Sequence, residues 1–142
     1  MSGTNDMSNK ILVVDDEIAV CKQLRKFLEP KGYSVLEAHS GEEALSIYKQ
    51  EKPDVVLLDV MMLGMNGLET LKELKSFDPE ASVIIVTAIR EKELAKQTLA
   101  EGAFDYITKP IDPDYLELAL MTQIVLRQNG KLASRSLVRF NL

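Results

Sequence analysis

The chain has 142 residues, of which 46% are hydrophobic and 27% are charged, a size and composition that fit one globular domain and exclude disordered and fibrous proteins. Its formal net charge of -5 disfavours nonspecific binding of nucleic acid by the chain as a whole. No apolar run approaches the roughly 20 residues of a membrane span, and the polar first ten residues are unlike a signal peptide, so we expect a cytoplasmic protein without membrane contact.

The first half of the chain alternates between strand and helix patterns. Residues 11–14 form a short continuous apolar run, typical of a strand buried on both faces of a sheet, and residues 18–28 repeat apolar side chains with helical spacing. Residues 33–38 alternate between apolar and polar side chains, which suits a strand at a sheet edge. Ser40, followed three residues later by Glu43, predicts a capping box that opens the next helix.

The second half of the chain repeats this alternation. Apolar runs at residues 55–58 and 83–86 predict two more buried strands, each followed by a helical segment, and residues 104–107 predict a fifth strand. Asp112 and Pro113 are typical of an N-cap and the first position of a helix, here the last one. Five strands alternating with five helices predict an α/β fold with a doubly wound, flavodoxin-like parallel sheet and helices on both faces.

Polar side chains stand at or just past the ends of the predicted strands. They are Asp15, Asp16, Asp59, Thr87 and Lys109. In a doubly wound sheet the carboxyl ends of the strands meet at one crevice, so these residues should share a pocket. Three carboxylates repel one another and the lysine supplies only one positive charge, so we expect a divalent cation with oxygen ligands, Mg²⁺ or Mn²⁺. Beside such a cation a carboxylate can act as nucleophile toward a phosphoryl group.

Four motifs, in this order, resemble those of the receiver domain of two-component response regulators. They are Val14-Asp15-Asp16-Glu17, Asp59-Val60-Met61-Met62 with Gly64-Met65-Asn66-Gly67, Thr87-Ala88, and Phe104-Asp105-Tyr106-Ile107-Thr108-Lys109-Pro110. The resemblance covers residues 9–127 and implies the strand order 2-1-3-4-5. It also implies a regulatory phosphoacceptor that assists its own phosphoryl transfer and autodephosphorylation, rather than an enzyme. One departure is Leu63, which stands where the family commonly has proline.

The resemblance implies a role for each matching residue. Asp59 is expected to accept a phosphoryl group from the phosphohistidine of a sensor histidine kinase or phosphotransfer protein. Asp15, Asp16 and Asp59, together with the backbone carbonyl of Met61, are expected to bind Mg²⁺. Thr87 is expected to bind the phosphoryl oxygens together with Lys109.

The same resemblance implies a switch and a control of lifetime. The ring of Tyr106 is expected to turn inward once Thr87 has moved toward the phosphoryl group, which changes the face made by the fourth helix, fifth strand and fifth helix. The Lys109–Pro110 peptide bond is expected to be cis. Met61 and Ile89 flank the pocket and are both apolar, so we expect them to hinder an attacking water and make the phosphoryl state long-lived.

The last helix and the two ends of the chain suggest contacts rather than chemistry. The apolar residues of that helix point in nearly every direction, more than the sheet can cover, so we predict a phosphorylation-sensitive homodimer or partner contact there. Residues 128–142 contain no acidic residue and are expected to be a basic extension or linker stub, with an output domain absent or removed. Residues 1–8 are expected to be disordered. The receiver itself is not expected to bind DNA.

The single cysteine and single histidine are assigned no function at this stage. Cys21 cannot form an internal disulfide bond, and from these counts we expect neither a zinc site nor Cys/His catalysis. Cys21 lies on an apolar helical stripe and is predicted to be a core residue. His39 is predicted to be an ordinary surface residue away from the crevice.

Three other functions are considered for the same fold. A flavodoxin-like binding module that is never phosphorylated remains an alternative. A haloacid-dehalogenase-like phosphatase is disfavoured because it would need a second aspartate where the chain has Met61. A nucleotide or flavin carrier is disfavoured because the turn Asp15-Asp16-Glu17 is acidic and lacks glycine, so it would repel a phosphate.

Overall fold

A computed structural model describes residues 8–62 and 66–140, with side chains as far as Asn129. Of residues 1–8, which are expected to be disordered, residues 1–7 lie outside the described residues, as does Leu63. The helices are α1 (Ile18–Leu28), the short 3-10 helix η2 (Glu29–Lys31), α2 (Gly41–Glu51), α3 (Gly67–Phe77), α4 (Lys92–Ala100) and α5 (Pro113–Phe140).

The strands form one parallel sheet. They are β1 (Lys10–Val14), β2 (Ser34–Ala38), β3 (Val55–Leu58), β4 (Val83–Thr87) and β5 (Asp105–Thr108). Their order in the sheet is β2-β1-β3-β4-β5, so the predicted doubly wound fold and strand order are confirmed. The three central strands consist almost entirely of buried apolar residues. In β2 only Val35 and Ala38 are buried, and this strand lies at the sheet edge, as its sequence pattern predicts.

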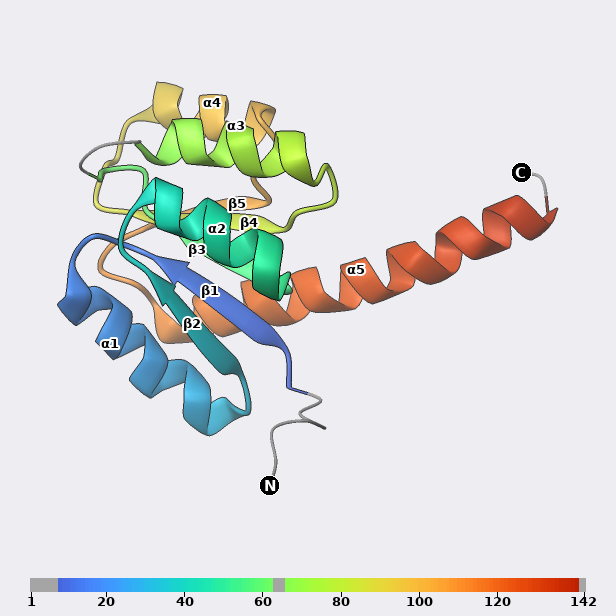
Figure 1. Cartoon of the computed structure of the whole chain (residues 1–142), viewed down its shortest axis with the longest axis horizontal. Coiled ribbons are helices and arrows are strands. Elements are labelled where there is room, and N and C mark those ends of the chain that lie inside the picture. Colours follow the sequence, from blue (N-terminus) through green and yellow to red (C-terminus); the bar gives the residue numbers. More distant parts are fainter. Residues whose placement is uncertain (1–7, 63–65, 141–142) are drawn as a thin grey trace.

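Two hydrophobic clusters fill the space on either side of the sheet. Helices α1 and α5 cover one face, while α2, α3 and α4 cover the other (Figure 1). Alternate residues of each central strand point into alternate clusters: Ile11 and Val13 pack toward α1 and α5, and Leu12 and Val14 toward α2 and α3. This sandwich fixes where the strands end, and with it the functional pocket.

Helix ends follow local sequence signals, with two corrections. Asn66 and Glu69 form a full capping box at the start of α3. At α2 the Ser40 hydroxyl accepts a hydrogen bond from the Glu43 backbone N–H, but the Glu43 carboxylate accepts from the N–H of His39, so the predicted box is incomplete. Ile18, placed on the buried stripe of α1 by its spacing, is exposed because it begins the helix at the surface.

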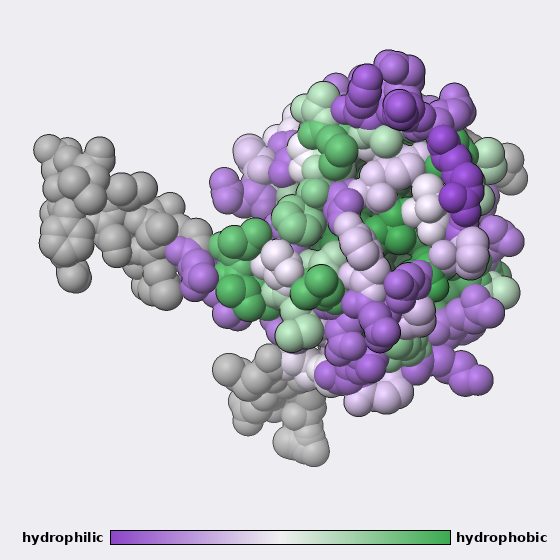
Figure 2. Space-filling view, turned by 180° about the vertical axis from the view of Figure 1, so that it is seen from behind, coloured by the Kyte–Doolittle hydropathy of each residue, from purple (hydrophilic) through white to green (hydrophobic). Residues whose placement is uncertain are grey.

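Helix α5 is apolar on two sides. Leu116, Ala119, Leu120 and Ile124 are buried against the sheet. The opposite side exposes Tyr115, Leu118, Met121, Val125 and Leu126. In Figure 2 hydrophobic side chains gather on the surface beside the point where the last helix leaves the domain. The prediction that the sheet cannot cover the whole helix is therefore confirmed. Among the described residues, no helix combines the length and apolarity that crossing a membrane requires.

Candidate functional site

The carboxyl ends of four strands bring distant polar residues into one pocket. Asp15 follows β1, Asp59 follows β3, Thr87 is the last residue of β4, and Lys109 follows β5. Asp15, Asp59 and Thr87 are only 2%, 5% and 0% exposed. Buried polar side chains at the ends of apolar strands need partners, so their contacts show how the pocket is built.

Lys109 is the centre of this pocket. Its Nζ lies 2.8 Å from Oδ2 of Asp15 and 3.3 Å from Oδ2 of Asp59. Its backbone N–H donates to the carbonyl of Thr87, which fixes β5 against β4 at this level of the sheet. The Lys109–Pro110 peptide bond is cis, the conformation that the resemblance implies. The ammonium group therefore joins two carboxylates that stand 44 residues apart.

The remaining oxygen of each carboxylate is held by the backbone. Oδ1 of Asp15 accepts from the N–H of Glu17, and Oδ1 of Asp59 accepts from the N–H of Met61, each at 2.9 Å. Met61 thus contacts the pocket through its N–H, while its side chain is 62% exposed. Asp16, next to Asp15 in the chain, is half-buried. The two aspartates are fixed by ordinary turn hydrogen bonds at the ends of their strands.

Burial and the ion pairs act in opposite directions on the charges of this pocket. Burial raises the pKa of Asp15 above its ordinary value and outweighs the hydrogen bonds from Lys109 and Glu17, while the charge of Asp59 raises it further. Burial lowers the pKa of Lys109, but the hydrogen bond to Asp15 and the attraction of both carboxylates outweigh it, so this pKa is raised overall. Lys109 therefore stays protonated, and the ionised form of Asp15 is destabilised.

The donor set of the pocket fits a divalent cation. One ammonium group faces two buried carboxylates, so the pocket carries excess negative charge in a region of low dielectric constant. The raised pKa of Asp15 reflects this unfavourable burial. Carboxylate oxygens are ligands that Mg²⁺ prefers.

The loop after β4 connects the pocket to Tyr106. The Thr87 hydroxyl accepts a hydrogen bond from the N–H of Ile89 at 3.4 Å, and the Tyr106 hydroxyl donates to the carbonyl of Ile89 at 2.7 Å. Tyr106 and Ile89 are both half-buried and pack against the cluster on the α2 and α3 face. A displacement of Thr87 would therefore be transmitted to the tyrosine ring through one residue.

Gly67 is a site residue whose role the sequence did not reveal. A Cβ atom at this position would lie 2.2 Å from Cα of Val60 and 2.4 Å from the carbonyl oxygen of Asp59. The first turn of α3 thus presses against the backbone of Asp59 itself, which only glycine permits. The Asn66-Gly67 pair indicates that a helix starts here. It does not indicate that the start of the helix packs against the backbone of Asp59.

The structure places a third potential ligand beside the single cysteine and the single histidine. Cys21 is in the core, as predicted, but its ligand atom and those of His39 and Glu37 all lie within 4.8 Å of one another. His39 contacts both Glu37 and Glu43, so it is not an isolated surface residue. Counting only cysteine and histidine did not consider Glu37, which lies on the edge strand β2.

Comparison with known proteins agrees with the pocket's chemistry. Residues 11–121 match the model of the response regulator receiver domain family. Over 134 residues the chain is 40% identical to transcriptional regulatory protein ZraR of Salmonella typhimurium, which covers 93% of this chain and 30% of that protein. This chain spans less than a third of the length of the ZraR proteins that it matches.

Two further similarities cover most of both partners. Sporulation initiation phosphotransferase F of Bacillus subtilis is 37% identical over 123 residues, which make up 87% of this chain and 99% of that protein. A chain in the crystal structure of the CheX–CheY–BeF3–Mg²⁺ complex of Borrelia burgdorferi superposes with a TM-score of 0.77 at 33% identity. That match covers 80% of this chain and 87% of the other.

Proposed function

Because the chain belongs to the response regulator receiver domain family, whose members are regulatory phosphoacceptors, we propose that Asp59 is its phosphoacceptor. The donor is the phosphohistidine of a sensor histidine kinase or phosphotransfer protein. The observation that carries the proposal is the Asp59 carboxylate, 5% exposed, with Lys109 3.3 Å from one oxygen and the Met61 N–H 2.9 Å from the other. Residues 9–127 act as the receiver, and the basic residues 128–142 extend from it.

Phosphoryl transfer needs little more than positioning in such a pocket. An oxygen of Asp59 forms a bond to phosphorus, the P–N bond of the phosphohistidine breaks, and the imidazole nitrogen keeps the electron pair. Lys109, already beside Oδ2 of Asp59, neutralises charge on the transferred oxygens, and the Thr87 hydroxyl donates to one of them. The chain thus assists its own phosphorylation and, with water as the acceptor, its own dephosphorylation.

Asp15, Asp16 and Asp59, with the carbonyl of Met61, would hold Mg²⁺, or Mn²⁺ in its place. The excess negative charge of the pocket supports this assignment, as does the similarity to a chain from the complex of CheX and CheY with BeF3 and Mg²⁺. The bound cation would supply positive charge to the phosphoryl oxygens. Asp15 then serves to bind the cation. Its burial destabilises the ionised carboxylate as long as no cation is bound.

The phosphoryl group acts on the rest of the chain through Thr87 and Tyr106. Thr87 moves toward the new oxygens, and the hydrogen-bonded path through Ile89 turns the Tyr106 ring inward. This changes the face of α4, β5 and α5, whose exposed apolar residues form a homodimer or contact a partner. The site of action is the cytoplasm.

Met61 and Ile89 set the lifetime of the phosphoryl group. Met61 follows Asp59 by two residues with its side chain exposed over the loop, and Ile89 is half-buried two residues after Thr87. Both lack a group that could orient water, so hydrolysis is slow. Replacing them together, Met61→Asn with Ile89→Glu, should shorten the half-life of the phosphorylated chain. A half-life that is equal or longer contradicts this role.

Intact-protein mass after incubation with Mg²⁺ and a small phosphodonor tests the proposal. We expect the wild type to gain one phosphoryl group and Asp59→Asn to gain none. Asp112→Asn is the matched control because Asp112 lies outside the pocket and asparagine caps a helix equally well, so it should behave as the wild type.

Two outcomes would overturn the assignment. If no variant gains mass, the chain is a binding module that is not phosphorylated. If Asp59→Asn gains as much as the wild type, the acceptor is another residue. Continuous turnover of many phosphodonors without retained mass would indicate a phosphatase instead.

A further inference from the structure

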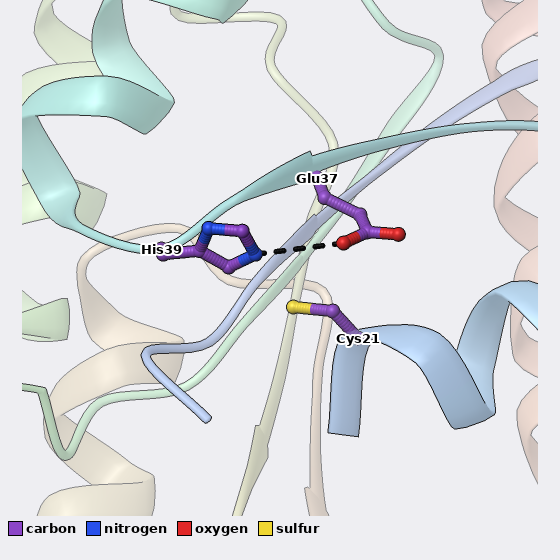
Figure 3. A group of neighbouring side chains, drawn as sticks. All are labelled: Cys21, Glu37 and His39. Atoms are coloured by element: carbon purple, nitrogen blue, oxygen red, sulfur yellow. Dashed lines mark ion pairs between the residues drawn. The ribbon is translucent and has the colours of Figure 1, made fainter. Parts of the chain in front are cut away.

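Three side chains with groups that can bind metal ions meet beside the edge strand β2. They lie outside the pocket of Asp15, Asp59 and Lys109, which we call the acidic pocket. Cys21 comes from α1, Glu37 from β2, and His39 from the loop after β2. The thiol, carboxylate and imidazole converge on one point (Figure 3), and their ligand atoms lie within 4.8 Å of one another. The phosphoacceptor chemistry does not use these groups, although the Cys21 thiol donates a hydrogen bond to the backbone carbonyl of Asp15 at 3.4 Å.

The surroundings leave one face of each group directed at this point. Oε2 of Glu37 is taken by Arg25 at 2.7 Å and Lys22 at 3.3 Å, but its Oε1 lies 3.5 Å from Nε2 of His39. The Nε2 atom is buried and has no hydrogen-bond partner among the residues that the structure describes. The 3.5 Å separation from Oε1 of Glu37 is too long for a good hydrogen bond, so a metal ion between these two atoms would satisfy a buried nitrogen that otherwise has only this distant carboxylate.

We propose that Cys21, Glu37 and His39 form a site for a transition-metal ion of the Zn²⁺ type, with water completing a tetrahedron. A thiolate, an imidazole nitrogen and a carboxylate oxygen are the three ligand types that Zn²⁺ binds. A tetrahedral Zn²⁺ holds such ligand atoms about 3.3–3.6 Å apart. The Glu37 and His39 atoms already stand at 3.5 Å, and the widest separation must shorten by about 1 Å, within reach of side-chain rotation.

Access is consistent with this site. The Cys21 side chain is in the core and the Glu37 side chain is 7% exposed, whereas the His39 side chain is 37% exposed, so an ion would enter past the imidazole. When the ion binds, the thiol proton is released to solvent and the Sγ–metal bond forms.

Titration of the full chain with Co²⁺ and Zn²⁺ in excess Mg²⁺ tests the site. The Mg²⁺ keeps the acidic pocket filled, and a cobalt–thiolate charge-transfer band reports sulfur ligation, which that pocket lacks. We expect one equivalent of Co²⁺ to produce the band and Zn²⁺ to displace it. Cys21→Ala should abolish the band, and His39→Gln should weaken Zn²⁺ binding more than about tenfold.

Two matched variants separate this site from its neighbours. Glu43→Gln removes a carboxylate that contacts His39 from the other side, and Asp59→Asn removes one from the acidic pocket; both should keep the band. No cobalt–thiolate band in the wild type, or unchanged Zn²⁺ affinity in His39→Gln, would overturn the proposal. His39 is partly exposed, so this variant decides the question even if Cys21→Ala does not fold.

Discussion

The acidic pocket and the outer side of α5, which carries Leu118, Met121 and Val125, differ in their exposure to solvent. The pocket buries charged groups, and every one of its side chains described above has a partner in the chain. The outer side of α5 instead exposes Leu118, Met121 and Val125, each at least half accessible to solvent. Charge is costly inside and apolar surface is costly outside, so neither region serves the stability of the isolated domain. We propose a function for both regions.

The two regions also differ in how they are built. The pocket needs four strand ends from the whole length of the chain, so it exists only when the sheet is complete. The apolar side of α5 follows from the sequence of one helix. A change to the fold should therefore damage the pocket first, and a surface change can alter the helix face alone.

The largest effect should come from breaking the backbone support of the pocket at Gly67. Alanine there places a methyl group against the backbone of Asp59 and Val60, so we expect the free energy of unfolding to fall by about 3 kcal/mol. Urea denaturation measures it. Gly32→Ala is the control: its φ of +98° strains alanine but nothing lies within 4 Å, so it should cost only about 1 kcal/mol. Equal losses would contradict the steric explanation.

Asp15→Asn removes a buried negative charge from the acidic pocket and so tests whether that charge lowers the free energy of unfolding. The pKa of Asp15 in the folded chain is raised, so its stabilising contribution is complete below its ordinary pKa of 3.8 and is lost as the pH rises through the folded value. At pH 7 the ionised group destabilises the fold, and asparagine should raise the free energy of unfolding by about 1 kcal/mol without divalent cations.

The pH dependence distinguishes this cause from others. The advantage of Asp15→Asn should shrink as the pH falls from 7 toward 4, because the wild-type carboxyl takes up its proton in the folded state. Urea denaturation in EDTA at several pH values measures this, with Asp112→Asn as an exposed control. If Asp15→Asn is instead less stable than the wild type at pH 7, and this loss shrinks toward acid pH, the charge of Asp15 stabilises the pocket.

The smallest effect on stability should come from the other region. Leu118 is 63% exposed, so Leu118→Lys should change the free energy of unfolding by less than about 0.5 kcal/mol. It should nevertheless abolish the homodimer that we propose to form with Mg²⁺ and beryllofluoride, as measured by analytical ultracentrifugation. Thr122→Lys, on the same helix but polar, tests whether the added charge alone is responsible. A wild type that stays monomeric with the mimic would count against the dimer.

The sequence predicted those parts that depend on local pattern or on a rule of topology. Buried strands showed as continuous apolar runs, and the doubly wound fold then placed Asp15, Asp59 and Lys109 in one pocket. It could not predict contacts between side chains of separate elements. Gly67 against Asp59 and Cys21 beside His39 each depend on distances that no spacing along the chain encodes. The roles of the pocket residues remain predictions until the phosphorylation experiment is done.

Helix α5 is long and continuous, so it can transmit a movement along its axis. It begins at Pro113, four residues after Lys109, and continues without a break to Phe140, a length of about 42 Å. Arg127, whose guanidinium donates to the carbonyl of Glu80, acts as a fulcrum partway along. Arg127 lies near the middle of the helix, so a tilt of about 5° about this point would move each end by roughly 2 Å, in opposite directions. A rearrangement around a phosphoryl group at one end of α5 could thereby reach the other end of the helix, where it could engage or release another molecule.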